Sequence, residues 1–264
     1  MYAFEYVRAK SVDEALKALA GADDGVLLAG GHTLIPTLKQ RLANPSHVID
    51  IGGLKELKGI SVKGGTVSVG AGTPHGQVAN SAEVKKAIPA LADLAGHIGD
   101  PQVRNRGTIG GSIANNDPAA DYPAAVVGLG ATVHTNKREI AGDDFFTGMF
   151  ETALGEGEIV TKVTFPQPKK AAYMKFPNPA SRYAIVGVMV ADTADGVRVA
   201  VTGAGPGVFR VPEMEAALAK NWSPDAVAGI AVSADDLNAD IHASAEYRAH
   251  LITVMAKRAV AKAG

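Results

Sequence analysis

The sequence predicts a mixed α+β protein with more than one domain. In residues 1–57, short apolar strands alternate with amphipathic helices, which is typical of a small α/β unit. From Ile60 the pattern changes to the period-two alternation of strands. A stretch rich in proline and lysine, Pro166–Lys170, then precedes the last third, and 264 residues are enough for more than one core.

The first part contains two predicted helices and two predicted strands. Ser11–Glu14 has the capping-box pattern, so a helix is expected from Val12 to Gly21. Val26–Leu28 predicts a buried strand that runs into a pair of glycines. The apolar spacing over Leu34–Leu42 predicts a second helix, and Val48–Ile51 predicts another strand.

The middle of the chain predicts a hairpin followed by helices. Two alternating segments, Ile60–Val62 and Thr66–Val69, flank a turn at Lys63–Gly65. The later elements are expected in this order: a helix over Glu83–Ala95, a glycine-rich loop, a helix over Tyr122–Leu129, and strands at Val133 and Ile159–Phe165.

The last third predicts a second α+β unit. It begins with two candidate strands, Ala184–Ala191 and Val197–Thr202, which are separated by Asp195–Gly196. Helices are expected at about Pro212–Lys220, Ser223–Gly229 and Ala245–Lys262.

Composition excludes several classes of function. The net charge is −1, so nothing indicates a nucleic-acid or membrane-surface binder, both of which need a basic excess. No apolar run is long enough for a transmembrane helix, and the first residues lack the pattern of a signal peptide, so a cytoplasmic location is expected. The chain has no cysteine, which excludes disulfides and thiolate-held zinc or iron–sulfur sites.

The first glycine loop, Ala29–Thr33, follows a predicted strand and precedes a predicted helix. Glycine allows the backbone N–H groups to approach an anion closely, and Thr33 adds a hydroxyl donor. Taken alone, the pair Gly30–Gly31 is also consistent with a simple tight turn, and that interpretation is slightly preferred.

The second glycine loop, Thr108–Ser112, is more specific. Two hydroxyl residues bracket Gly110–Gly111, and the amides of Asn115 and Asn116 follow. A plain turn leaves these polar side chains unexplained, whereas neutral donors aimed at one point suit a pyrophosphate. Two other glycine-rich stretches are interpreted as structural turns: Val69–Gly76 has one residue too many before its third glycine, and Thr202–Gly207 has Pro206 in the critical turn.

The segment Thr108–Pro123, together with Ala29–Pro36, closely resembles the FAD-binding medium subunits of molybdenum hydroxylases. These are the xanthine dehydrogenase and aerobic carbon monoxide dehydrogenase enzymes, and the separate short chain is most similar to the carbon monoxide dehydrogenase branch. The likeness extends to Ala243–Arg248, which is typical of the carboxy-terminal domain of that family.

The resemblance implies an α+β flavin-binding fold of the PCMH or vanillyl-alcohol-oxidase type. This fold consists of two FAD-binding subdomains, here placed at residues 1–57 and 58–168, and a smaller carboxy-terminal α+β domain at residues 169–264. It further implies an oxidoreductase subunit that takes electrons from a [2Fe–2S] small subunit, fed in turn by a molybdopterin large subunit, in a dimer of heterotrimers. These two cofactors are expected only on the partner chains, and FAD is expected to be held noncovalently. The complex can also associate peripherally with the inner membrane.

The resemblance implies FAD contacts at positions that match the family pattern, and it implies neither a catalytic nor a metal-ligating residue in this chain. The implied contacts are Ala29, Gly30, Gly31, His32, Thr33, Leu34, Ile98, Thr108, Ile109, Gly110, Gly111, Ser112, Asn115, Asp121, Ile159, Val160, Lys175 and Tyr183.

Several of these residues have a purely structural alternative. Asp121 precedes Tyr122–Pro123 and is equally suited to be a helix N-cap. Ile98 alone predicts a core residue, and Tyr183 alone a strand-edge tyrosine. Lys175 alone predicts a solvated lysine on a strand, although a cation beside flavin N1 would stabilise the reduced form.

His32 leaves two possibilities open for the flavin. Related folds attach FAD covalently through a histidine next to paired glycines, whereas the medium-subunit pattern implies that His32 only lines the pocket. The alternative function is a self-sufficient FAD oxidase or dehydrogenase of the same fold. It would require a substrate pocket with a catalytic base.

Overall fold

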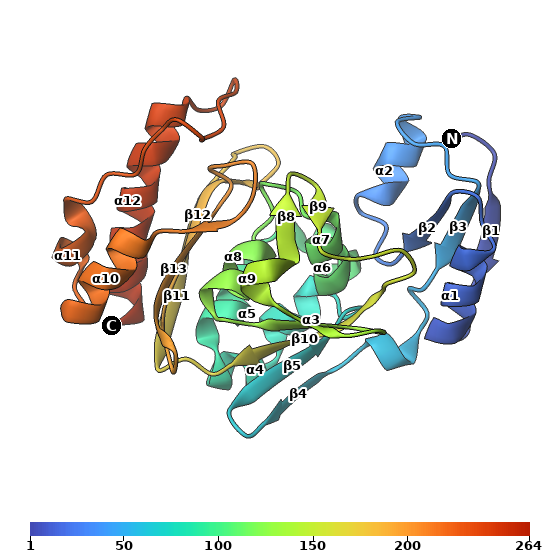
Figure 1. The fold of residues 1–264 in the computed structure, drawn as a ribbon, viewed down its shortest axis with the longest axis horizontal. Helices are drawn as coiled ribbons and strands as arrows, with labels where there is room; N and C mark the ends of the chain where they lie inside the picture. Colours follow the sequence, from blue (N-terminus) through green and yellow to red (C-terminus); the bar gives the residue numbers. More distant parts are fainter.

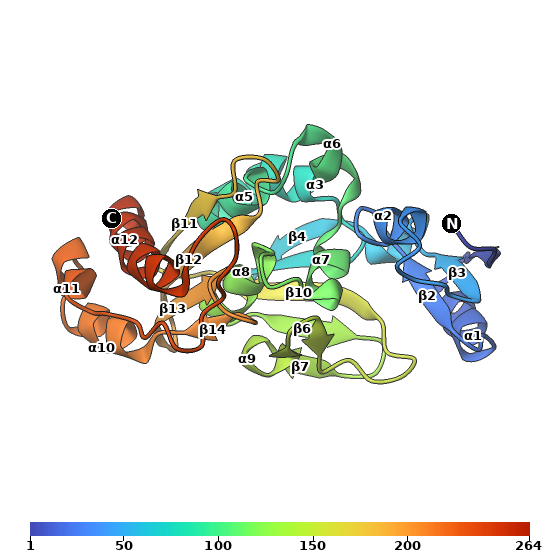
Figure 2. The ribbon, with the colours of Figure 1, turned by 90° about the horizontal axis from the view of Figure 1, so that it is seen from above.

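The computed structural model describes all 264 residues. The chain forms three successive parts along the long axis of the molecule, with the N-terminal part at one end and the C-terminal part at the other (Figures 1 and 2). Each part has a cluster of buried apolar side chains, and a few residues join the cluster of a neighbouring part: Tyr173, Met189 and Ala191 the central one, and Ile159 the N-terminal one. These three cores support the division at about residues 57 and 168, which we propose as the domain boundaries.

The N-terminal part is a three-stranded parallel sheet with two helices. The elements are β1 (Glu5–Arg8), α1 (Val12–Ala20), β2 (Gly25–Leu28), α2 (Leu34–Lys39) and β3 (His47–Asp50), with the strands in the order β1-β3-β2. Helix α1 begins where predicted, since the Ser11 hydroxyl accepts the N–H of Glu14 at 3.1 Å. Helix α2 ends earlier than predicted, because Arg41 adopts a left-handed conformation with φ 59° and leaves Leu42 exposed.

The central part is built on a five-stranded antiparallel sheet. Its strands, in sheet order, are β4 (Ile60–Lys63), β5 (Thr66–Gly70), β10 (Val160–Pro166), β6 (Thr132–Thr135) and β7 (Glu139–Ala141). The predicted hairpin is therefore confirmed as β4–β5. A short 3-10 turn, η1 (Lys55–Leu57), leads into it, and β8 (Phe146–Gly148) pairs with β9 (Glu151–Thr152).

Seven helices accompany this sheet. They are α3 (His75–Asn80), α4 (Ala82–Ala87), α5 (Pro89–Gly96), α6 (Pro101–Arg106), α7 (Ile109–Asn115), α8 (Tyr122–Gly128) and α9 (Gly142–Phe145). The single helix predicted over Glu83–Ala95 is divided into α4 and α5. Ile88, which precedes Pro89, lies outside the helical region with φ −138° and ψ 78°, because a residue before proline avoids helical geometry.

The C-terminal part is a four-stranded antiparallel sheet with a helix layer on one face. The elements are β11 (Lys170–Pro177), β12 (Ala184–Thr193), β13 (Gly196–Thr202), β14 (Phe209–Arg210), α10 (Pro212–Lys220), α11 (Pro224–Ala228) and α12 (Ala245–Ala263). Helix α12 packs on β11 and β12, while α5 and α8 of the central part cover the other face (Figure 1). Because both faces are covered, β12 is buried along nearly its whole length.

Candidate functional site

A cavity with a volume of about 770 Å³ lies where the N-terminal and central parts meet. Both glycine loops line it, as do the turn after β5, the turn Ile98–Gly99 and the start of β10. The connection between β11 and β12 adds a wall from the C-terminal part. A cavity of this size suits a small organic molecule.

The first glycine loop exposes a run of unused backbone donors. The N–H groups of the five residues Gly30–Leu34 make no hydrogen bond within the chain, and all five residues line the cavity. Gly31 has φ +76°, a conformation that favours glycine, and a Cβ there would lie 2.6 Å from the Ile35 side chain. Consecutive free N–H groups in a loop form a binding site for an anion such as a phosphate.

The second glycine loop uses its backbone donors internally. The Ile109 and Gly110 N–H groups donate to the carbonyl oxygens of Thr73 and Ala71, at 3.2 and 2.8 Å. Thr108 caps α7, and its hydroxyl accepts the Gly111 N–H at 3.2 Å. Gly110 and Gly111 are helical, and neither has a positive φ.

Side chains of the second glycine loop and of α7 remain available to a ligand. The Ser112 hydroxyl and the Asn115 amide line the cavity and have no hydrogen-bond partner in the chain. Asn116 has a different role, because its side-chain amide donates to the carbonyl oxygens of Gly148 and Glu151, both at 2.8 Å, and so holds the β8–β9 turn.

The first glycine loop touches the backbone directly before the second one, at Arg106–Gly107, and this contact explains Gly30. A Cβ on Gly30 would lie 2.1 Å from the Arg106 carbonyl oxygen, so only glycine permits the approach. On the next residue, a Cβ at Gly107 would lie 2.6 Å from Nε2 of His75. The His75 imidazole therefore lies next to Gly107, close to the point where Gly30 meets Arg106.

His75 was not predicted from the sequence, although it belongs to the stretch Val69–Gly76 that was interpreted as a structural turn. Its side chain is buried, lines the cavity, and has an Nδ1 atom without a partner. Burial, reinforced by His32 and Arg104, lowers the pKa of His75 to about 4. The cavity thus has a neutral imidazole in its wall at physiological pH.

Asp121 is held in a buried polar cluster at the edge of the cavity. The Tyr173 hydroxyl donates to its carboxylate at 2.6 Å, and the Lys175 ammonium donates to it at 2.9 Å. Asp121 makes no side-chain capping bond to α8, so the N-cap alternative does not hold. Burial raises the pKa of Asp121, while the Lys175 charge and the Tyr173 hydroxyl act against that rise.

Lys175 is not the solvated lysine that its local sequence suggests. Its side chain is only 5 % exposed, and it also donates to the His97 carbonyl oxygen at 3.1 Å. It does not line the cavity and reaches it only through Asp121.

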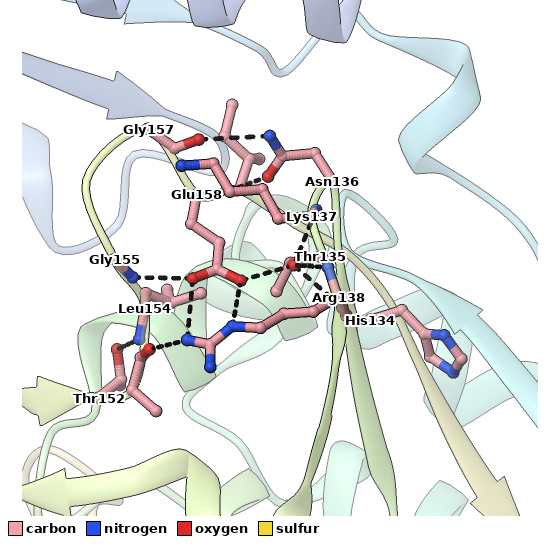
Figure 3. A network of polar contacts seen from close by, with 12 residues as sticks. His134, Thr135, Asn136, Lys137, Arg138, Thr152, Leu154, Gly155, Gly157 and Glu158 are labelled. Atoms are coloured by element: carbon pink, nitrogen blue, oxygen red, sulfur yellow. Dashed lines mark hydrogen bonds and ion pairs between the residues drawn. The ribbon is translucent and has the colours of Figure 1, made fainter.

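Glu158 anchors the segment that leads into β10. Figure 3 shows its carboxylate between Arg138, Thr135 and the Gly155 N–H, with the guanidinium bound at 3.0 and 3.1 Å. The hydrogen bonds from Arg138 are the main reason that the pKa of Glu158 falls to about 2. This network fixes the position of Ile159 and Val160, which follow directly and line the cavity.

The structure brings most of the predicted contacts to one cavity. The predicted residues that line it are Ala29, Gly30, Gly31, His32, Thr33, Leu34, Ile98, Thr108, Gly110, Gly111, Ser112, Asn115, Asp121, Ile159, Val160 and Tyr183. Lys175 does not line it, and Ile109 is fully buried in the core of the central part. The His32 ring is exposed, with Nε2 3.3 Å from the Gln102 carbonyl oxygen.

The residues present fit FAD. This cofactor joins a doubly charged pyrophosphate to a large, flat, largely apolar ring, so its site needs donors at one end and apolar walls at the other. The first glycine loop offers five unpaired N–H groups, and Ser112 and Asn115 add neutral donors. Ile98, Val160 and Tyr183 supply apolar and aromatic surface in the same cavity.

Comparison with known proteins identifies the family. Residues 2–168 match the FAD binding domain in molybdopterin dehydrogenase, and residues 171–263 match the CO dehydrogenase flavoprotein C-terminal domain. The chain belongs to this family of FAD-binding flavoprotein subunits. The expected fold is confirmed, with an FAD-binding region followed by a smaller C-terminal α+β domain.

Relatives match over nearly the full chain. The nicotine 6-hydroxylase medium subunit of Paenarthrobacter nicotinovorans is 36 % identical, over 99 % of this chain and 98 % of the relative. The carbon monoxide dehydrogenase medium chain of Hydrogenophaga pseudoflava is also 36 % identical, over 97 % of this chain and 96 % of the relative. Among solved structures, reconstituted CO dehydrogenase from Oligotropha carboxidovorans superposes with a TM-score of 0.91 at 32 % identity, over 99 % of this chain and 97 % of that chain.

These matches confirm that the chain is an FAD-containing oxidoreductase subunit of the molybdenum hydroxylase type, similar to the medium chains named above. They support this function and not the alternative of a self-sufficient oxidase. No helix of the structure is both long and apolar enough to cross a bilayer.

Proposed function

We propose that this chain holds FAD noncovalently as the electron relay of a molybdenum hydroxylase. In this complex a [2Fe–2S] small subunit delivers electrons and a molybdopterin large subunit oxidises the substrate, in a dimer of heterotrimers in the cytoplasm. The relatives named as medium chains support this arrangement. The absence of cysteine is consistent with iron–sulfur clusters on another chain.

The observation that most directly supports FAD binding is the run of five unpaired N–H groups over Gly30–Leu34. These donors bind the pyrophosphate without any lysine, and the Ser112 hydroxyl and the Asn115 amide approach it from the second glycine loop. The contact between Gly30 and Arg106, just before the second glycine loop, keeps the two sets of donors at a fixed separation.

The remaining residues place the ring and keep water away from it. Ile98 and Val160 provide apolar walls, and Tyr183, 46 % exposed, lies at the open edge of the cavity. The Asp121–Lys175 pair supplies a fixed buried charge pair behind this wall. Bound FAD supplies one- and two-electron redox chemistry, so the chain needs no acid or base to activate a substrate.

The proposal is tested by titrating the flavin-free chain with FAD and following flavin fluorescence. We expect one FAD per chain, and we expect all of the flavin to be released when the protein is denatured. Absence of binding would refute the proposed cofactor site. Flavin that remains attached after denaturation would show a covalent bond, for which His32 is the candidate, and would contradict noncovalent binding.

A further inference from the structure

Three cationic side chains converge on one short turn of the cavity wall. Each of the three side chains donates hydrogen bonds to backbone carbonyl oxygens of the consecutive residues His97–Gly99. Lys175 donates to His97 at 3.1 Å. Arg104 donates from Nη1 to both Ile98 and Gly99, at 3.0 and 2.9 Å. Arg182 donates from Nη1 to Gly99 at 3.2 Å.

These bonds orient the turn relative to the cavity. Because its carbonyl oxygens are all engaged by cations, the turn cannot rotate its peptide groups without breaking charge-assisted hydrogen bonds. The N–H groups of Gly99 and Asp100 have no partner in the chain, and Ile98 and Gly99 line the cavity. Gly99 has φ +51°, and a Cβ there would lie 2.8 Å from the Val103 side chain.

The three cations come from different parts of the chain. Arg104 belongs to α6, next to the turn, and Lys175 belongs to β11. Arg182 lies in the connection between β11 and β12, which extends from the C-terminal part to the cavity. Arg182 is therefore the only one of the three cations that links a loop of the C-terminal part to the His97–Gly99 turn.

The connection that presents Arg182 has a defined conformation. The Asn178 side chain accepts the N–H groups of Ala180 and Ser181, at 2.9 and 3.1 Å. Its backbone N–H donates to Tyr183, and its carbonyl oxygen accepts the Arg182 N–H. Arg182 has φ +64°, a conformation that glycine would adopt without steric cost, so the backbone gives no reason for an arginine here.

We propose that Arg182 is a positioning residue of the flavin site, which acts through the Gly99 carbonyl oxygen to hold the Ile98–Gly99 turn against the cofactor. This inference rests on the proposed FAD site. With Arg182 in this role, the C-terminal part contributes to the cavity both Tyr183, which lines it, and Arg182, which holds the Ile98–Gly99 turn in place.

The test compares Arg182→Gly with Arg41→Gly in the full chain. Both arginines have positive φ, at 64° and 59°, so glycine relieves the backbone in both, but Arg41 does not line the cavity. We expect Arg182→Gly to weaken FAD binding about 10-fold and to change the visible spectrum of the bound flavin, because one charge-assisted hydrogen bond is lost. Arg41→Gly should leave the affinity and the spectrum unchanged.

Rescue separates positioning from a general effect on folding. Arg182→Lys keeps a cation that can reach the Gly99 carbonyl oxygen, so it should restore most of the affinity, whereas Arg182→Asn, which tolerates positive φ, should not. Unchanged affinity and spectrum in both Arg182→Gly and Arg182→Asn would overturn the inference while the FAD site itself stands. A wild-type chain that binds no FAD would instead refute the proposed function.

Discussion

The two glycine loops are alike in sequence, each with a glycine pair beside the start of a helix, but their backbones have opposite roles. In the first glycine loop the N–H groups of Gly30–Leu34 have no partner in the chain, and all five residues line the cavity. In the second, the N–H groups of Ile109–Ser112 are all bonded within the chain. We therefore propose that the first loop is a backbone cradle for an anion and that the second is a scaffold that presents side chains.

The difference also changes the physical reason for each glycine. Gly30 allows the first loop to touch Arg106, just before the second loop, and Gly31 provides positive φ. Gly110 allows α7 to pack against Ala71, where a Cβ would lie 2.5 Å from the Ala71 Cβ. A Cβ at Gly111 would have only one close neighbour, the Thr108 hydroxyl at 3.0 Å, and would meet no backbone atom of another segment. A glycine pair is therefore weak evidence for a phosphate site until the partners of its N–H groups are known.

The largest effect is expected from Gly110→Val, which should lower the free energy of unfolding of the flavin-free protein by about 3 kcal/mol, because the side chain overpacks against Ala71. Gly111→Val is the matched control and should cost less than about 1 kcal/mol. Both variants should lose FAD, but only Gly111→Val should do so without destabilising the fold. Urea denaturation of both variants checks this, and equal destabilisation would contradict the distinct roles of the two glycines.

The second-largest effect is a pH dependence of stability that comes from His75, which lies next to Gly107. Because folding lowers the pKa of His75 from 6.5 to about 4, the unfolded chain binds more protons between these values, and stability falls as the pH decreases. Between pH 6.5 and about pH 4.5 the wild type should lose about 2 kcal/mol more than His75→Gln, which cannot titrate. Parallel pH profiles of the two proteins would show that His75 is not buried in its neutral form.

Much of the fold follows from local signals in the sequence. Ser11 caps α1, the turn Lys63–Gly65 joins β4 to β5, and Pro212 begins α10, all as predicted. The two helix predictions that were wrong each failed at a single residue. Arg41 adopts positive φ and ends α2 early, and Pro89 forces Ile88 out of helical geometry.

The site was harder to predict than the fold. The resemblance to the flavoprotein family placed most contacts at the cavity, but periodicity alone could not show that Ala71 and Thr73 use the donors of the second glycine loop. Nor could it show that Lys175 is buried against Asp121, because that depends on the packing of α5 and α8 against the C-terminal sheet. His75 and Arg182 reach the cavity only through tertiary contacts, and neither has a sequence signal of its own.

The smallest of these effects tests the anion cradle directly. Thr33→Asp places a carboxylate beside the free N–H groups, where it competes with the pyrophosphate, so FAD binding should weaken about 10- to 30-fold. The same carboxylate should stabilise the flavin-free protein by about 0.5 kcal/mol, because it interacts with donors that otherwise have no partner in the chain. Thr33→Asn is the uncharged control for both measurements.

Ser112→Asp provides the contrast between the loops. It also places a negative charge at the cavity, and it should weaken FAD binding, but it should not stabilise the flavin-free protein because the neighbouring N–H groups are already bonded. Thermal melting of the flavin-free variants, with FAD affinity measured in parallel, separates the two cases. If Thr33→Asp and Ser112→Asp shift the melting temperature equally, the first glycine loop has no special set of free donors, and the distinction between cradle and scaffold fails.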